Sequence, residues 1–434
     1  MSRSLSTRSH HVLAATLFLV TASRRTDAQP VTRADAARAA LSGGPRVALA
    51  RADTAAARAA LITARALPNP SLAATYSKSA PQKHLILDVP IDAPWSRGAR
   101  VGAATATARA ARLRFLSERT AALLEVDTTY TVALAAQARF RLSRQTARDA
   151  DSLRLMTAAR RDAGDASDLD VDLATITAGQ QWNVTATDSL TFMSAVLTVQ
   201  TLMGIPADSA TLILVDSLRL PMRDAVAPSP RIDSIAATPS APPEYLAGAL
   251  LASGAPSVSS TMPSIAAAEA SLTAAELAIA RERRGVLGVP SVQLGVEWGD
   301  PAEDPPNKLL PTIGVSIPLP LFNRNQGPIA QAQAERERAR AELAATRLAV
   351  RQRLVEGLRE RESLRARVTR DQTLVVSAER VAAKSLTAYR EGASALPAVL
   401  ESRRTARDVL TQYIDDVAAL LTVESELRAL TQTI

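Results

Sequence analysis

The chain has 434 residues, 47% of them hydrophobic, so it is long enough to bury a core and to form two or three domains. Aromatic residues make up only 3%, and Ala, Arg, Leu and Thr fill most positions, which favours long helices over compact sandwiches. The net charge is +8, but Arg alternates with Glu in stretches such as ERER at 335–338, which is typical of a solvated helix face and sets nucleic acid aside as a partner.

Residues 1–28 have the pattern of a signal peptide. Arg3 and Arg8 form a basic start, residues 12–22 form an apolar core too short to span a bilayer, and Ala28 ends a small-residue cleavage site. The chain has no Cys, so it forms no disulfide, thiolate metal site or cysteine-linked lipid anchor. No later segment reaches about 18 uninterrupted apolar residues. The sequence predicts an exported protein whose membrane contact, if it has one, uses strands.

The rest of the chain consists of two similar halves. LPNPSLAATYS at 67–77 parallels LGVPSVQLGVEW at 287–298, DAPWSRGAR at 92–100 parallels PLPLFNRNQ at 318–326, and GDASDLDVDLA at 164–174 parallels EGASALPAVLE at 391–401. Each half has the order helix, two strands, very long helix, tight turn, helix. We therefore expect a first repeat over 29–204, a Pro/Ser-rich linker over 205–243 and a second repeat over 244–434.

Four short segments alternate between apolar residues and small or polar ones. In the third segment Val292, Leu294 and Val296 share one face, whereas Gln293 and Glu297 share the other. Such alternation predicts half-buried strands. We expect them at about 69–78, 84–93, 290–299 and 310–318.

An ordinary surface sheet packed on helices is one interpretation of these strands. The export signal, a strand length close to the roughly 9–11 residues of a tilted membrane strand, and Tyr76 and Trp298 near strand ends favour a lipid-facing sheet instead. Four strands cannot close a barrel, and open edges are not tolerated in lipid. Three copies would supply about twelve strands, within the usual range of bacterial barrels, so we expect a homotrimer.

Two long helices follow the strand pairs, over about 97–162 and 326–389. At 1.5 Å per residue the second would be roughly 90 to 100 Å long, and its apolar stripe fits coiled-coil packing. The helices end at similar turns, one with Gly164 and Ser167 and the other with Gly392 and Ser394. Because Gly accepts the left-handed conformation that ends a helix and Ser caps the next one, both turns are predicted hairpin tips, far from the sheet.

Three stretches resemble the TolC-like outer-membrane efflux family, especially its heavy-metal and multidrug resistance branch. VTRADAARAALSGGPRVALARADTAAARAALITARALPNPSL is similar to the family's amino-terminal helix leading into the first strand, IPLPLFNRNQGPIAQAQAE to the junction before the second long helix, and YREGASALPAVLES to the helical turn. The resemblance covers nearly all of the mature chain. It implies a mainly α fold with a small β part: a homotrimer with a twelve-stranded barrel in outer-membrane lipid and a long α-helical tunnel across the periplasm.

The resemblance also implies partners and a passive role. A periplasmic adaptor (membrane fusion) protein and an inner-membrane efflux pump would deliver small molecules or metal ions to the duct. Pro94, Pro318 and Pro320 would stiffen the corner between barrel and tunnel, since proline fixes φ and cannot donate a ladder hydrogen bond. The pump mainly sets the substrate, which the sequence leaves open.

Periplasmic gate residues follow from the same resemblance. Asp170 resembles a tip carboxylate, Tyr389 resembles a gate tyrosine, and Glu401 lies where an acidic residue would face the lumen. The family pattern has Arg where this chain has Ser394, so a salt-bridge lock would need another cation, with Arg160 and Arg390 as candidates. Alternatively, Asp170 is a cap or a dipole partner at a helix start.

The sequence does not support catalysis or a cofactor. His10 and His11 lie in the leader, His84 stands alone, and neither a nucleophile elbow nor a Gly-rich phosphate loop occurs. We expect no catalytic residue, no cofactor and no metal site. Two other functions stay open: the outer-membrane duct of a type I protein secretion system, and a non-membrane periplasmic coiled-coil adaptor or scaffold.

Overall fold

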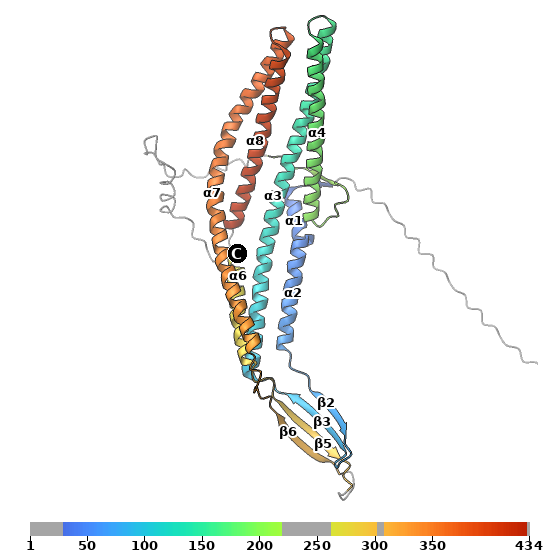
Figure 1. The fold of residues 1–434 in the computed structure, drawn as a ribbon, viewed down its shortest axis with the longest axis vertical. Coiled ribbons are helices and arrows are strands. Elements are labelled where there is room, and N and C mark those ends of the chain that lie inside the picture. The colour runs from blue at the N-terminus through green and yellow to red at the C-terminus, as the bar shows by residue number, and fades with distance from the viewer. Residues whose placement is uncertain (1–28, 219–261, 302–307, 432–434) are drawn as a thin grey trace, which may run out of the picture.

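The computed structural model describes residues 29–218, 262–301 and 308–431. The predicted signal peptide, most of the predicted linker and the first part of the predicted second repeat therefore lie outside the described residues. The described part is elongated, with two helical hairpin tips at one end and a sheet at the other (Figure 1).

The first repeat consists of α1 (Arg33–Gly43), α2 (Pro45–Arg65), β2 (Ser71–Tyr76), β3 (Lys83–Pro90), α3 (Pro94–Asp162) and α4 (Asp168–Leu202). In this repeat, α1 and α2 lead down to the sheet, and α3 then returns beyond α1 to the hairpin tip (Figure 1). A capping box of Thr32 and Asp35 begins α1, and Pro45 occupies the first turn of α2, where its missing N–H has no cost. α2 packs on the half of α3 nearer the sheet and α4 on the half nearer the tip (Figure 1).

The second repeat follows the same path. Its elements are α6 (Pro263–Arg284), β5 (Ser291–Trp298), β6 (Leu310–Ser316), α7 (Gln326–Arg390) and α8 (Leu396–Thr431). α6 contacts both long helices, α3 and α7, whereas α8 packs along α7 and α3 nearer the tips. The order of helix, two strands, long helix and helix thus occurs twice among the described residues.

The strands form one antiparallel sheet of four, in the order β2-β3-β5-β6. β2, β5 and β6 lie inside the predicted ranges, and β3 begins at Lys83, one residue earlier than expected. A second, two-stranded sheet was not predicted: β1 (Gln29–Val31) pairs in parallel with β4 (Leu212–Leu214) and ties the start of the first repeat to the segment after α4.

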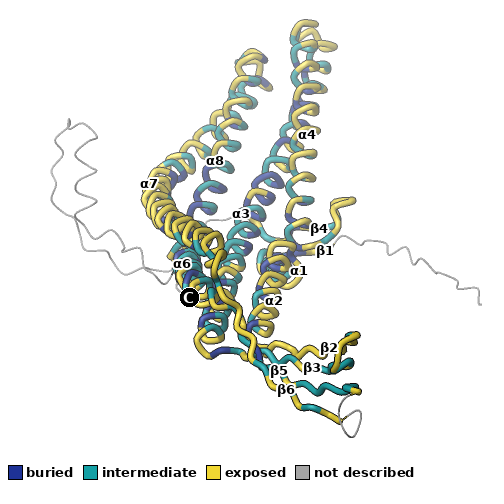
Figure 2. Tube along the Cα trace, turned by 60° about the horizontal axis from the view of Figure 1, so that its bottom comes forward, coloured by how far each residue is buried: buried dark blue, intermediate teal, exposed yellow. Residues whose placement is uncertain are grey.

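Burial is concentrated in narrow stripes between helices. The tube in Figure 2 shows the outer side of α7 largely exposed, because this helix packs on neighbours along one side only. The predicted apolar stripe on α7 is buried at Leu343, Val350, Leu354, Leu364 and Val368. The largest cluster gathers around β1, β4, α1, α3 and α4. Its central Tyr130 donates a 2.9 Å hydrogen bond to the Val31 carbonyl.

Candidate functional site

One face of the four-stranded sheet is apolar and exposed. The register places Leu72, Leu87, Leu294 and Ile313 side by side across all four strands. Their exposed fractions are 66%, 36%, 45% and 78%. The next row of the same face contains Ala74, Leu85, Val296 and Pro311. A contiguous apolar surface of this kind marks a contact with lipid or protein.

The other face of the sheet is mostly small or polar, with Ile86 and Leu310 as its large apolar residues. One row contains Ser71, Asp88, Gln293 and Gly314. Another contains Thr75, His84, Glu297 and Leu310. The Nδ1 atom of His84 lies 3.4 Å from Oε1 of Glu297. The sheet therefore separates an apolar side from a side that suits water.

The first corner between sheet and helix is short and held by a buried carboxylate. Pro94 is the first residue of α3. Two residues earlier, the Asp92 side chain is only 5% exposed and accepts hydrogen bonds of 3.0 and 2.9 Å from Nη2 of Arg100. Nε of Arg100 also donates to the Ala64 carbonyl at 3.0 Å, so this corner is joined to the end of α2.

The second corner is longer, over residues 317–325. Gly288, with φ of 61°, lies so close to Pro318 that an added Cβ would be 2.7 Å from the proline ring. Asn325 also has φ of 61°, and its Nδ2 donates to the Glu282 carbonyl at 2.9 Å and to Glu282 Oε2 at 3.0 Å. Hydrogen bonds from Arg281 and then Asn325 lower the pKa of Glu282. Pro320 is half-buried.

The first hairpin tip carries a complete capping box. Gly164 has φ of 84°, and Ser167 precedes α4. Ser167 Oγ accepts from the Asp170 N–H at 3.2 Å, and Asp170 Oδ2 accepts from the Ser167 N–H at 3.1 Å and from its hydroxyl at 2.8 Å. Asp170 is thus bound to the helix start, as the capping interpretation requires; its predicted part in a gate stays a prediction.

The second tip has the same backbone turn without that cap. Gly392 has φ of 76°, and α8 begins at Leu396. The Ser394 hydroxyl makes one long contact of 3.5 Å, to the Ala395 carbonyl. The Leu396 side chain is buried, at 1% exposure, in a cluster with Leu153 and Val399. Packing rather than a side-chain cap fixes the start of α8.

Tyr389 joins the two tips. It is 4% exposed, and its hydroxyl lies 3.1 Å from the Thr157 hydroxyl of α3. The Arg160 guanidinium lies over the Tyr389 ring at 4.7 Å and also donates to the Tyr389 carbonyl. Of the two cations suggested by the sequence, Arg160 therefore contacts the predicted gate tyrosine.

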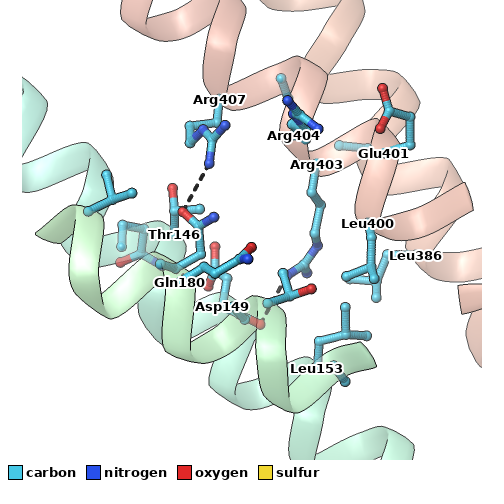
Figure 3. A pocket seen from close by; sticks show the side chains of 18 of the residues that line it. Thr146, Asp149, Leu153, Gln180, Leu386, Leu400, Glu401, Arg403, Arg404 and Arg407 are labelled. Atoms are coloured by element: carbon cyan, nitrogen blue, oxygen red, sulfur yellow. Dashed lines mark hydrogen bonds between the residues drawn. The ribbon is translucent and has the colours of Figure 1, made fainter. Parts of the chain in front are cut away.

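A pocket of about 1030 Å³ separates the two hairpins below their tips. Figure 3 shows Arg403 of α8 reaching toward Asp149 on the opposite hairpin, with Leu153, Leu386 and Leu400 at the other end of the pocket. Arg407 also reaches across, and its Nη1 donates to Oε1 of Gln181 on α4 at 3.2 Å. Nη1 of Arg403 donates to the Asp149 carbonyl at 3.0 Å. Burial lowers the pKa of Arg403. Glu401 lines the same pocket.

Sequence reasoning missed the pocket arginines. The only local signal was the run SRRTAR at 402–407, in which Arg403 and Arg407 are four residues apart and so share one helix face. In the described ranges, no group of three or more His, Asp or Glu side chains is arranged to hold a metal ion. Likewise, none of the described helices combines the length and the hydropathy needed to cross a membrane.

Solved structures of bacterial membrane proteins, among them an outer-membrane channel, share this fold. VceC of Vibrio cholerae is 16% identical with a TM-score of 0.71, and the match covers 92% of this chain and 96% of that one. CmeC of Campylobacter jejuni is 14% identical with a TM-score of 0.73, covering 92% and 85%. A membrane protein of Pseudomonas aeruginosa is 20% identical with a TM-score of 0.70, covering 92% and 90%.

The search of curated proteins found no match. The family model for outer membrane efflux proteins matches residues 36–204 and 257–432, which is most of the chain and includes both repeats. Its members are channels and not enzymes. The predicted efflux role and outer-membrane location are thereby confirmed. The chain belongs to the outer membrane efflux protein family.

Proposed function

We propose that three copies of this chain form one efflux duct. Three four-stranded sheets would close a barrel of twelve strands in the outer membrane. The helices would continue it as a periplasmic tunnel that receives small molecules or metal ions from an inner-membrane pump through a periplasmic adaptor. The chain would act as a passive exit, and the pump would supply both the energy and most of the selectivity.

One observation carries this proposal: the sheet has an exposed apolar face and two unpaired edges. β2 and β6 each pair with a single neighbour among the described strands. In lipid, an unpaired edge leaves N–H and C=O groups without hydrogen-bond partners. Each such group costs roughly several kcal/mol. Pairing β6 of one copy with β2 of the next removes both edges, and closure of the ring removes them all.

Aromatic residues at both ends of the sheet support the proposal that the sheet spans the membrane. Tyr76 and Trp298 end β2 and β5 at the loop side. At the corner side, Trp95 is 51% exposed and Phe322 is 95% exposed. Aromatic girdles of this kind flank the apolar band of membrane barrels. A water-exposed scaffold would instead leave these rings and the apolar face without a partner.

The first experiment is to express the full chain with its leader in a Gram-negative host and to measure the mass of the particle extracted from the outer membrane. A trimer of the 45.9 kDa chain, less its leader, is expected. A detergent-independent monomer or dimer in the periplasm would contradict the proposal.

Disulfide trapping tests the shared barrel directly, because the chain has no Cys of its own. Ala73→Cys on β2 is combined in turn with Leu310→Cys, Thr312→Cys and Gly314→Cys on β6, all on the polar face. Within one sheet these strands are three spacings apart, roughly 14 Å, which exceeds the roughly 7 Å Cα limit of a disulfide. We expect one register to give covalent dimers and trimers. The control pair of Ala73→Cys with Ile313→Cys, on opposite faces, should give none.

The gate is proposed at the tips, where Asp170 and Tyr389 lie on the two hairpins and Glu401 lines the pocket below them. Asp170→Asn keeps an oxygen that accepts the Ser167 hydrogen bonds, and with Glu401→Gln it removes two charges per copy. We expect changed single-channel conductance and cation preference in a planar bilayer. Unchanged values for both would leave these carboxylates with structural roles only.

A further inference from the structure

The level at which the sheet meets the helices carries an excess of positive charge. Four stretches of chain lead into or out of the sheet there, at residues 62–70, 91–100, 280–290 and 317–330. Together they contain seven arginines and two carboxylates. In Figure 1 the ends of α2 and α6 and the starts of α3 and α7 lie next to the sheet. The charge is thus gathered at one level of the molecule.

The two carboxylates at this level are already bound. Asp92 is paired with Arg97 and Arg100, and Glu282 is paired with Arg281. The remaining arginines are exposed, and their side chains form no ion pair or hydrogen bond with the residues that the structure describes. We call them the corner arginines: Arg65, Arg283, Arg284 and Arg324. Their positive charges are therefore available to an anionic partner.

The helix dipole explains the position of only some of the corner arginines. Arg65 lies in the last turn of α2, and Arg283 and Arg284 lie in the last turn of α6, where a cation is favourable. Arg324 instead comes just before Asn325, the N-cap of α7, where a cation is unfavourable. An anion bound at this level would offset that repulsion.

Large apolar side chains adjoin Arg324 in the chain. The stretch 317–322 leaves four of them exposed: Ile317, Leu319, Leu321 and Phe322. This stretch follows β6 directly, so it extends the apolar face of the sheet toward the helices. Asn325 holds its far end through hydrogen bonds to Glu282. Exposed apolar side chains next to arginines are typical of segments that lie at a membrane surface.

We propose that the corner arginines bind the phosphate groups of anionic phospholipids in the inner leaflet of the outer membrane. This inference rests on the proposed trimer, in which the apolar face of the sheet meets lipid and each arginine occurs three times around the barrel. Phe322 and its apolar neighbours enter the acyl region, and the arginines lie at the head groups. A guanidinium donates two parallel hydrogen bonds to one phosphate, which favours arginine for this contact.

Tryptophan fluorescence tests the lipid contact, because the chain has three Trp. Trp182→Phe with Trp298→Phe leaves Trp95 in the first turn of α3, a helix that packs against α2 and α6. Trimers of this variant are reconstituted in phosphatidylcholine vesicles that contain an equal fraction of either brominated phosphatidylglycerol or brominated phosphatidylcholine, since bromine quenches Trp on contact. At 0.01 M salt we expect phosphatidylglycerol to be enriched roughly fivefold around Trp95.

Replacing the arginines tests their part in this preference. Arg283→Gln, Arg284→Gln and Arg324→Gln together are expected to remove most of the enrichment. Each single variant is expected to remove part of it, and these variants also serve if the triple variant does not assemble. Raising the salt to 1 M, where the Debye length is about 3 Å, is expected to weaken the enrichment in the unsubstituted collar as well.

The matched control removes the same charge far from the sheet. Three exposed arginines of α7 without an ion pair among the described residues are replaced, as Arg351→Gln, Arg359→Gln and Arg380→Gln. The first of them is 25 residues beyond the start of α7, roughly 37 Å along the helix. This variant is expected to keep the full preference of Trp95 for phosphatidylglycerol.

A second reporter separates this inference from the proposed function. Trp95→Phe with Trp182→Phe leaves Trp298, at the opposite end of the sheet. If neither brominated lipid quenches Trp298 or Trp95, the sheet is not in the membrane, and the proposed function and this inference are both wrong. If Trp298 is quenched, the inference alone is overturned by any of three results: equal quenching of Trp95 by the two lipids, a preference that survives the triple variant, or its equal loss in the control variant.

Discussion

The two hairpin tips have the same turn but begin their second helices by different means. At the first tip, Ser167 and Asp170 cap α4 through hydrogen bonds within three residues. At the second, Ser394 provides no such cap, and support comes from Leu396 and from Tyr389, which contacts the first hairpin. The first tip is thus locally stable, whereas the second depends on the two hairpins staying together. The second tip is the part expected to change when they separate.

Removing the Tyr389 ring is expected to destabilise the second tip more than any other single change proposed here. Because the side chain is 4% exposed, Tyr389→Ala leaves a cavity, and the opening free energy of the second tip should fall by about 3–5 kcal/mol. Hydrogen exchange of the amides at 385–400 measures it, with the amides at 162–175 as the internal reference. Tyr389→Phe loses only the hydroxyl contact with Thr157 and should cost about 0.5–1.5 kcal/mol. Unchanged exchange in Tyr389→Ala would refute the support assigned to this ring.

Replacing Ser167 and Ser394 one at a time compares the two tips directly, with a smaller expected effect on stability. Ser167→Ala removes the cap of α4 and should destabilise the start of that helix by about 1 kcal/mol. Ser394→Ala removes a hydroxyl with a single 3.5 Å contact and should leave the start of α8 unchanged. Faster exchange at both helix starts, or at neither, would show that the tips do not differ as described.

The hairpins also differ in how polar groups connect their helices. In the first, Nε1 of Trp182 on α4 donates to Asp151 of α3 at 2.8 Å. In the second, Asp371 of α7 faces the buried Asp416 of α8. Oδ1 of Asp416 accepts hydrogen bonds from Arg367 and Gln412. Burial, and then the hydrogen bond and charge of Asp416, raise the pKa of Asp371, while Arg367 and Arg370 oppose the rise.

A raised acid pKa means that the folded protein holds the proton more tightly than the unfolded chain, so stability falls as pH rises from the ordinary pKa to the raised one. Asp371→Asn removes this dependence and supplies a donor for Asp416 Oδ2, which lacks one in the described residues. We expect a higher Tm at pH 7.5 and a smaller gain at pH 4, by thermal unfolding of the purified protein. The control is Asp151→Asn in the first hairpin, which should not gain stability at pH 7.5.

Local patterns predicted the elements well. Alternation gave the strands, Gly164 and Gly392 gave the turns, and the apolar stripe gave the buried side of α7, because each depends on residues close together in the chain. The partners of Tyr389, the pocket around Arg403 and the pairing of β1 with β4 were not predicted. Each depends on segments brought together from distant parts of the chain, such as Thr157 and Tyr389, which are separated by 232 residues.

The paired packing of the long helices limits how the length of the molecule can change. α3 has 69 residues and α7 has 65, and each lies against shorter helices over most of its length. A one-residue deletion in either would shift everything beyond it by about 1.5 Å and turn it by about 100°. Tyr389 would then no longer meet Thr157. Evolution can therefore lengthen or shorten such a protein to fit a wider or narrower cell envelope only by matched changes in both repeats, close to whole heptads.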